Sequence, residues 1–470
     1  MTQQSLRQKR PLEQMNNQES HEKSINAATH FHWWEKYIGS IWRNRDFRTL
    51  WLSLTITHFG GQVTFLALPL TAAILLDASP LEMGILTAME ALPYTLFGLF
   101  TGVLIDRSRK LRLIILADIG RGLALMLVPI AAWLGFLSMP ILYLVGFLVG
   151  TGGIIGWAAY QVFMAERVGN DNLVEANAGI ALSDSASSLI GPGIAGALIH
   201  WLTAPFAIML DAISFFLSAA MLRGIPPMAS DAPKLRAASD DKAAFAGIWA
   251  DAKEGLKMIL GHAVLRSIGF TLMLWNILKH AYLAIVILYA TRDLALSPGK
   301  IGALFMVAGI GFLIASATCQ WFNRRFGVGY VMLIGLTLTG VAWLMVSGVI
   351  VNDWAGAQLG AALFLMDLGA MLFFINYLSL RQAATPEHLR GRVTSTLIFI
   401  SVSLAPLGSL LGGVLGTWLG LRMTIAICGG AGLLLGLALL KWSPLGAMRE
   451  LPTPQKTVKI IPITPEMSAE

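Results

Sequence analysis

The chain has few charged residues and almost no cysteine. Only 13% of its 470 residues are Asp, Glu, Lys or Arg, about half the roughly 25% that soluble domains carry. Hydrophobic residues make up 56% of the chain, so its polar side chains are too few to cover the surfaces of soluble domains. The composition excludes an ordinary water-soluble enzyme and indicates a polytopic membrane protein.

Several motifs are also missing. Cys319 and Cys428 are the only cysteines and lie far apart in apolar stretches, which excludes a disulfide framework and a CxxC metal site. No GxxxxGK[ST] loop occurs, so ATP-driven transport would need a separate subunit. No His/Asp or Cys/His set is positioned at one membrane face, so we expect no enzyme activity, no metal and no cofactor. Residues 1–49 lack the apolar core of a cleavable signal peptide, so the first apolar segment is expected to act as an uncleaved insertion signal.

Twelve segments are long and apolar enough to cross a bilayer. A bilayer core about 30 Å thick needs about 20 residues of helix. An even number of spans places both termini on the same side. The expected spans are 47–76, 83–105, 111–134, 140–160, 178–200, 205–222, 264–290, 301–321, 328–350, 356–378, 393–418 and 421–440.

The distribution of Lys and Arg sets the orientation, because these residues are retained on the cytoplasmic face. Of the 34 Lys and Arg residues, 29 lie in or beside the segments on the side of the termini. The opposite loops hold only Arg292, Lys300 and Arg422. We therefore expect a bacterial inner-membrane protein with both termini cytoplasmic. This topology explains the net charge of +7 without a nucleic-acid partner.

Two sequence passages recur at nearly the same offset, which predicts a duplicated six-helix unit. The passage from Gly98 to Lys110 returns in degenerate form between Gly311 and Gly327, and residues 170–173 resemble 386–389. Within the link between the halves, residues 248–260 have apolar positions at helical spacing and could lie along the membrane surface. The expected division is a disordered tail at 1–46, a six-helix bundle at 47–222, a cytoplasmic linker at 223–263, a second bundle at 264–441 and a tail at 442–470.

These motifs resemble the major facilitator superfamily. The segment from Gly98 to Lys110 is similar to that superfamily's loop signature between helices two and three. Four further passages resemble the drug:proton antiporter branch that contains macrolide efflux proteins and the enterobactin exporter, and the likeness covers roughly residues 44–442. The passages are Asp46-Phe47-Arg48, Asp118 with Arg121, Gly191-Pro192-Gly193 and Leu389-Arg390-Gly391-Arg392. The resemblance implies an all-α fold of two six-helix pseudo-repeats, with a substrate site near the bilayer midplane and alternating access.

The loop signature contains the gating candidates. The resemblance implies that Asp106, with Arg107 and Arg109 nearby, latches the two halves when the cavity faces outward. Gly98 and Gly102 in the same span permit close approach of another helix. The alternative interpretation of the arginines is that they only hold this end of the chain at the lipid head groups.

Two carboxyl groups are candidates for proton coupling, because ionisable side chains inside a bilayer are costly and mark functional sites. Glu90 lies in the second expected span, about 10 Å below the outer surface. Asp367 lies near the middle of the tenth, which lines the cavity in the superfamily that the chain resembles. For each, the alternative is a side chain hydrogen-bonded to a neighbouring helix. The expected fourth span has no charge, whereas drug exporters of related branches often carry an arginine there.

Four other charged residues within spans are interpreted as structural. Asp118 and Arg121 are three residues apart on one helix and can form a neutral pair. Asp184 and Asp211 lie about two turns into their spans, which favours snorkelling or capping of neighbouring helix ends.

Spans one, four, seven and ten provide the candidates for substrate contact, because the resemblance places these spans around the cavity. A histidine or aromatic residue in a membrane helix is more often packed and satisfied, and this alternative applies to each of them. The candidates are His58, Gln62, Trp157, Trp275, Asn276, Lys279, His280, Phe373 and Asn376.

The sequence predicts a secondary active exporter, a proton antiporter, of a small amphiphilic molecule. The cargo is a siderophore or a drug-like compound such as a macrolide. A lysolipid transporter or flippase of the same fold is the alternative, and a non-transporting membrane receptor is a third. The expected partners are the substrate, protons and the bilayer. The chain could work as a monomer and could feed a periplasmic or outer-membrane export system.

Overall fold

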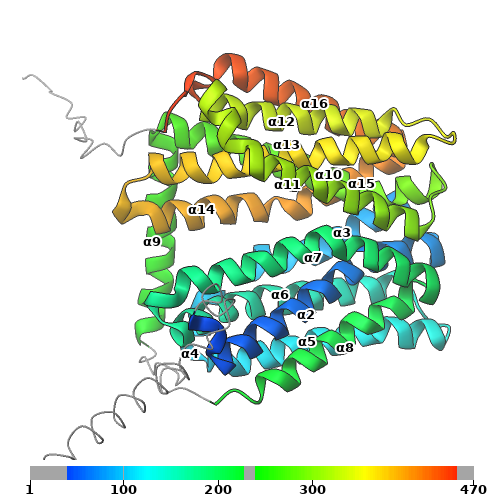
Figure 1. Cartoon of the computed structure of the whole chain (residues 1–470), viewed down its shortest axis with the longest axis horizontal. Helices are drawn as coiled ribbons and strands as arrows, with labels where there is room; N and C mark the ends of the chain where they lie inside the picture. The colour runs from blue at the N-terminus through cyan, green and yellow to red at the C-terminus, as the bar shows by residue number, and fades with distance from the viewer. Residues whose placement is uncertain (1–39, 99, 227–238, 452–470) are drawn as a thin grey trace, which may run out of the picture.

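The computed structural model describes residues 40–98, 100–226 and 239–451, and these residues form helices joined by short connections (Figure 1). This part contains no β-strand, which confirms the expected all-α fold. The long helices are α2 (Arg45–Leu70), α3 (Pro80–Phe97), α5 (Lys110–Trp133), α6 (Met139–Val168), α7 (Leu173–Leu202), α8 (Ala204–Leu222), α9 (Ser239–Gly261), α10 (Ala263–Arg292), α11 (Pro298–Phe326), α12 (Val328–Ser347), α13 (Ala355–Ala384), α14 (Arg390–Ser403), α15 (Ala405–Leu419) and α16 (Leu421–Trp442). The short ones are η2 (Ser40–Arg43), η3 (Thr71–Leu75), α4 (Thr101–Arg107), η4 (Asn170–Asn172), η6 (Glu387–Leu389) and η7 (Pro444–Ala447).

Every expected span falls on one or two of these helices, but not all of the helices are equally apolar. Within the described residues, ten candidate spans are long and apolar enough to cross a membrane, and α3 with α4 makes an eleventh. Helix α7, which covers the expected span 178–200, is more polar because it carries Glu175, Asp184 and several serines. The count of twelve spans therefore stays a prediction.

Two of the expected continuous spans are broken. The second bends by 63° between α3 and α4. The eleventh breaks at Leu404, between α14 and α15. Pro406 explains the break between α14 and α15, because it has no backbone N–H to donate to the carbonyl of Val402. Val402 lies on the wall of the cavity described below.

The helices form two groups that lie side by side, α2–α8 and α10–α16 (Figure 1). Both ends of the described chain leave from the same end of the molecule, which we call the terminal end, and the other we call the distal end. Near the terminal end each group has its own apolar core, one containing Phe47 and Phe163 and the other containing Phe373 and Leu380. Toward the distal end a single core continues across both groups. The two halves are thus packed together distally.

Glycines bring the halves into backbone contact. A Cβ at Gly84 on α3 would lie 2.9 Å from the Cα of Gly413 on α15, and one at Gly196 on α7 would lie 2.8 Å from the Cα of Gly302 on α11. Such pairs let helices approach closely in a membrane. An ion pair between Asp77 and Arg292 joins the halves in the same region.

Replacing Gly302 by alanine is expected to lower the free energy of unfolding by about 1–3 kcal/mol, because the new methyl group would overlap the backbone of Pro192 and Gly196. Thermal unfolding of the purified protein in detergent measures the change. Gly120→Ala on α5 is the matched control, since no atom lies within 4 Å of a Cβ there. The contact interpretation is wrong if both variants unfold at the wild-type temperature.

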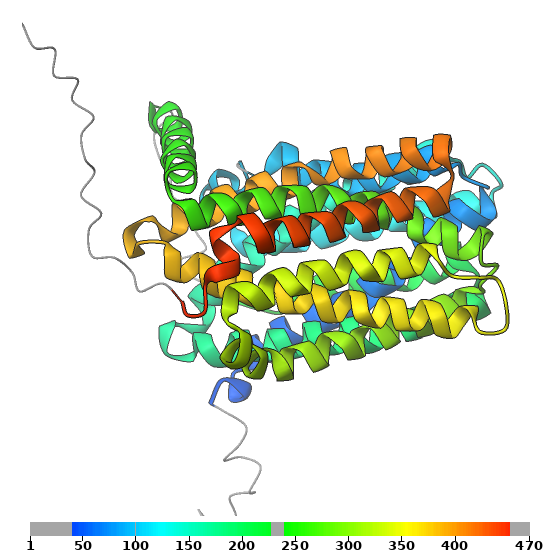
Figure 2. The same ribbon diagram turned by 90° about the horizontal axis from the view of Figure 1, so that it is seen from above.

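Helix α9 crosses the terminal end, roughly perpendicular to the bundle helices (Figures 1 and 2). It contains residues 248–260, so this segment is helical as expected. Arg392 on α14 ties α9 to the second half, with its Nε 2.8 Å from Asp251 and a second ion pair to Glu254.

The chain ends are more ordered than expected close to the bundle. Residues 40–46 form η2 and the start of α2, with Ile41 buried, and η7 buries Leu445. The remaining parts of the expected tails and linker, 1–39, 227–238 and 452–470, lie outside the described residues.

Candidate functional site

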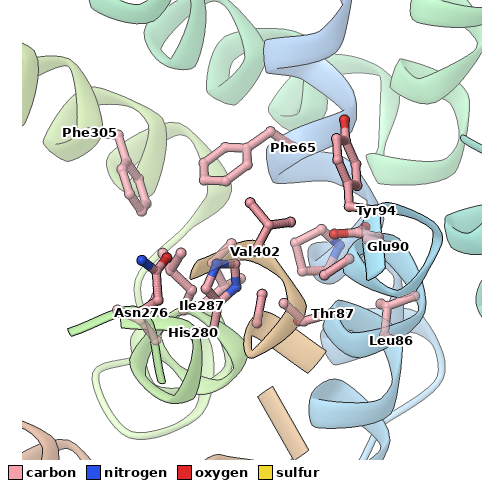
Figure 3. Close-up of a pocket in the computed structure, with 15 residues that line it drawn as sticks. Phe65, Leu86, Thr87, Glu90, Tyr94, Asn276, His280, Ile287, Phe305 and Val402 are labelled. Atoms are coloured by element: carbon pink, nitrogen blue, oxygen red, sulfur yellow. The ribbon is translucent and has the colours of Figure 1, made fainter. Parts of the chain in front are cut away.

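A cavity of about 350 Å³ lies between the two halves (Figure 3). Helices α2 and α3 line it from the first half, and α10, α11, α14 and α15 line it from the second. We call it the central cavity. Its lining residues are Phe65, Pro69, Leu86, Thr87, Glu90, Ala91, Tyr94, Asn276, His280, Leu283, Val286, Ile287, Phe305, Val402 and Ala405.

Three of the candidates from the sequence meet in the central cavity. Helical spacing puts Glu90 and Tyr94 on one face of α3, and Asn276 and His280 on one face of α10. Figure 3 shows these side chains arranged around the same space. The structure therefore brings Glu90, Asn276 and His280 together, although they lie far apart in the sequence.

The polar groups of the central cavity retain capacity to bind a ligand. Glu90 makes no ion pair with a described residue. The Nδ1 atom of His280 is buried and has no hydrogen-bond partner among the described residues. Asn276 donates one hydrogen bond from its amide nitrogen to the carbonyl of Leu272 at 3.0 Å. This bond does not use its amide oxygen, which can still accept from a ligand. A carboxyl, an imidazole and an amide thus face a mostly apolar space. Such a site suits a small molecule with both apolar and polar parts.

Aromatic rings from both halves meet above these polar groups. Phe65 on α2 and Phe305 on α11 are in edge-to-face contact with centroids 6.0 Å apart. Neither ring stands out in the sequence, because each lies in an apolar run. Tyr94 was also missed, although it lies one turn beyond Glu90 on the same face.

A second cavity of about 240 Å³ lies inside the first half, and we call it the inner cavity. His58 and Trp157 line it, as does Tyr94, which also lines the central cavity. Trp157 stacks on Tyr160 with centroids 6.1 Å apart, and the Nδ1 atom of His58 lies 3.5 Å from the Asp184 carboxylate. Two of the substrate-contact candidates therefore lie beside the central cavity rather than in it.

Asp118 and Arg121 also line the inner cavity, but they do not form the expected direct pair. Asp118 instead accepts a hydrogen bond of 2.7 Å from Ser218 on α8. Arg121 places its guanidinium 3.9 Å from the ring centroid of Phe215. Asp118, and Asp211 on α8, both interact electrostatically with Arg121, although neither forms a direct ion pair with it among the described residues. The charged group therefore has three members on two helices.

Asp211 neither snorkels nor caps a helix end, contrary to expectation. Its side chain is buried, with a relative exposure of 1%. It accepts hydrogen bonds from Thr64 on α2 and from Ser214 at 3.0 Å. The sequence interpretation failed because one partner, Thr64, comes from another helix, and the sequence does not fix how that helix is rotated. Asp184, by contrast, is exposed.

The candidates in the second half fall into two groups. Lys279 lies over the Trp275 ring at 5.1 Å and interacts electrostatically with Asp367 on α13. Phe373 and Asn376 were expected to line the cavity. They are instead fully buried in the core of the second half. Phe373 packs on Trp275 at 5.2 Å, and Asn376 donates to the carbonyl of Leu372 at 2.8 Å.

Gln62 and the gating candidates lie outside both cavities. The side chain of Gln62 packs against Gly191 on α7. Gly98 ends α3, while Gly102 has no atom within 4 Å of its Cβ position, so the expected close approach at Gly102 is not found. Asp106 on α4 is exposed and pairs with no described residue.

Two ion pairs at the terminal end stay within the first half. Lys110 on α5 pairs with Glu166 on α6 at 3.2 Å, and Arg167 on α6 pairs with Asp46 on α2. Arg107 and Arg109 lie at this end on the exposed surface. No ion pair links Asp106 to the second half within the part of the chain that the structure describes, so the expected latch stays a prediction.

Comparisons with known proteins agree with this architecture. The chain is 27% identical to an MFS-type transporter of Bacillus subtilis over 84% of its length and 93% of that protein. It is 24% identical to the multidrug efflux pump Tap of Mycolicibacterium fortuitum, covering 80% of this chain and 90% of the pump. It is 25% identical to the enterobactin exporter of Salmonella typhimurium, and the match covers 84% of this chain and 95% of that exporter.

Solved structures share the fold. An inward-facing bacterial homologue of the iron transporter ferroportin matches with a TM-score of 0.67 at 18% identity, covering 85% of this chain and 99% of that one. A D-xylose–proton symporter matches with a TM-score of 0.63 at 14% identity, covering 86% and 99%. Residues 40–462 match the family described as transmembrane secretion effectors. The chain belongs to this family of the major facilitator superfamily and is a multi-pass membrane transporter.

Proposed function

We propose that this transporter exports a small amphiphilic molecule in exchange for protons, across the inner membrane and with both termini cytoplasmic. The observation that carries the proposal is the central cavity, where Glu90, His280 and Asn276 face apolar and aromatic walls contributed by both halves. The efflux pump and the enterobactin exporter among its relatives support export. A siderophore and a drug-like compound such as a macrolide both have the required mix of polar and apolar groups.

Alternating access would move the halves, 47–222 and 264–441, as two bodies. In the structure they share a core at the distal end, while the terminal end has separate cores and an exposed Asp106 that pairs with no described residue. With cytoplasmic termini, this arrangement corresponds to a transporter closed toward the outside. Opening outward would separate Asp77 from Arg292 and part the glycine contacts, and would bring Asp106 toward the second half.

Two carboxyl groups would couple this movement to protons. Glu90 lies in the central cavity itself, so substrate and proton can compete for the same space. Asp367 interacts with Lys279, so its protonation would free the lysine charge within the second half. We assign Glu90 the principal role because it borders the cavity, whereas Asp367 does not line either cavity.

Replacing His280 or Asn276 by alanine is expected to weaken the binding of an exported compound about tenfold, the value of one lost hydrogen bond. Cells that express the chain are loaded with macrolides, siderophores or cationic dyes, and efflux is measured. Ser316→Ala, an exposed position on α11 outside the cavity, is the matched control. If efflux by both cavity variants depends on the concentration of the compound as it does in the wild type, the substrate binds elsewhere.

A further inference from the structure

Three charged residues lie inside the first half, apart from Glu90 and Asp367. Asp118 and Arg121 lie on α5, and Asp211 lies on α8. The two carboxyl side chains are 7% and 1% exposed. The Nε atom of Arg121 is buried and has no hydrogen-bond partner among the described residues. We call this group the buried charge cluster.

The buried charge cluster has an excess of negative charge when all its members are ionised. Two carboxylates face a single guanidinium, and a buried charge without a partner is strongly unfavourable. The other titratable groups around it are His58 on α2, Tyr94 on α3 and Tyr160 on α6. His58 already lies beside Asp184, and the two tyrosines carry no positive charge. One bound proton makes the cluster neutral.

The two carboxyl groups differ in their hydrogen bonds and in their access to the inner cavity. Asp211 accepts from two hydroxyl groups, those of Thr64 and Ser214, and hydrogen bonds to a carboxylate favour its ionised form. Asp118 accepts from Ser218 alone. Asp118 also lines the inner cavity, whereas Asp211 does not. Asp118 is therefore the carboxyl placed to exchange a proton through the inner cavity, while Asp211 has more hydrogen bonds that favour its ionised form.

The inner cavity, which Asp118 lines, shares one wall residue, Tyr94, with the candidate substrate site. Tyr94 lines both cavities, and its hydroxyl oxygen would lie 3.2 Å from a Cβ placed at Gly153. The hydroxyl of Tyr160, also on the inner cavity wall, is buried without a partner among the described residues. These groups can hold the waters that a proton needs to travel between the cavities.

We propose that Asp118, placed beside Arg121 and Asp211, is a second proton-binding residue of the transporter, loaded through the inner cavity. The inference rests on the proposed proton exchange and adds a site that lies wholly within the first half. A proton on Asp118 neutralises the cluster. Its release leaves a buried negative charge next to the wall of the substrate site, which disfavours an anionic ligand there and favours a cationic one.

The test measures proton binding itself rather than transport. Purified protein lacking the other two coupling carboxyls, with Glu90→Gln and Asp367→Asn, is titrated by infrared difference spectroscopy of the carboxyl C=O band. Adding Asp118→Asn, which keeps the shape of the side chain, is expected to remove a single titrating carboxyl per chain. Ser218→Ala is expected to move the midpoint of that titration to higher pH, because the ionised carboxylate loses its hydrogen-bond donor.

Two results would overturn the assignment. One is a carboxyl signal that keeps its full size after Asp118→Asn, and the other is a midpoint that Ser218→Ala leaves in place. The titration also separates this proposal from the proposed function. Proton-coupled export with an unchanged titration would remove the second site alone. If Asp118→Asn removes a titrating proton but the protein shows no proton-coupled export, the second site is supported and the proposed exchange is wrong.

Discussion

Glu90→Gln is expected to reduce substrate-driven proton movement to the level of vesicles without the protein. Glutamine has nearly the same size as glutamate. A larger side chain would not fit here, because Gly146 and Gly150 of α6 pack against Glu90. Glutamine cannot take up or release a proton. The fold and the central cavity therefore persist while the coupling is lost. The measurement is proton flux in inverted vesicles on addition of an exported compound.

Three controls separate coupling from damage. Asp353→Asn, an exposed position in the loop before α13, should behave as wild type. Glu90→Asp keeps a carboxyl and should retain part of the flux. Exchange of labelled for unlabelled substrate without a pH gradient should survive Glu90→Gln, because it needs binding and movement but no proton. Full proton flux in Glu90→Gln would show that this carboxyl does not carry the proton.

A cross-link across the distal end is expected to abolish transport. Asp77 and Arg292 form an ion pair between the halves, so cysteines at both positions lie within the reach of a bifunctional reagent whose spacer matches the length of that pair. The joined halves could not part at this end, and the cavity would stay closed toward that side. Cleavage of a reagent with a reducible spacer should restore transport. The native Cys319 and Cys428 are buried and do not compete for the reagent.

The matched control cross-links two helices of one half. Asp46 on α2 and Arg167 on α6 also form an ion pair, but both belong to the first half. Cysteines there should form a cross-link that leaves transport largely intact, because the halves move as bodies. Transport that continues with the Asp77–Arg292 positions joined would contradict alternating access through the distal end.

Much of the helical architecture could be predicted from the sequence because a membrane helix must be long, apolar and internally hydrogen-bonded. Each expected span therefore falls on a helix. The breaks were harder to place. The bend between α3 and α4 falls inside an apolar run with no proline at the junction, and only Pro406 gave a local signal for the second break.

The site could be predicted only in part, because the sequence does not fix how each helix is rotated within its bundle. Glu90, Asn276 and His280 were found by their polarity. Phe373 and Asn376, on a helix expected to line the cavity, turned out to face the core of the second half. Partners between helices are hidden for the same reason, as the hydrogen bonds from Thr64 to Asp211 and from Ser218 to Asp118 show.

Proton flux in wild-type vesicles tests the central claim most directly. Inverted vesicles that hold a pH gradient receive catechol and hydroxycarboxylate siderophores, macrolides and cationic dyes in turn, while uptake of each compound is followed in parallel. The account predicts that a compound taken up by the vesicles also collapses the gradient, and that neither event occurs without the protein. Uptake with the gradient intact would contradict proton exchange, and translocation of a labelled lysolipid under those conditions would favour a lipid transporter of the same fold.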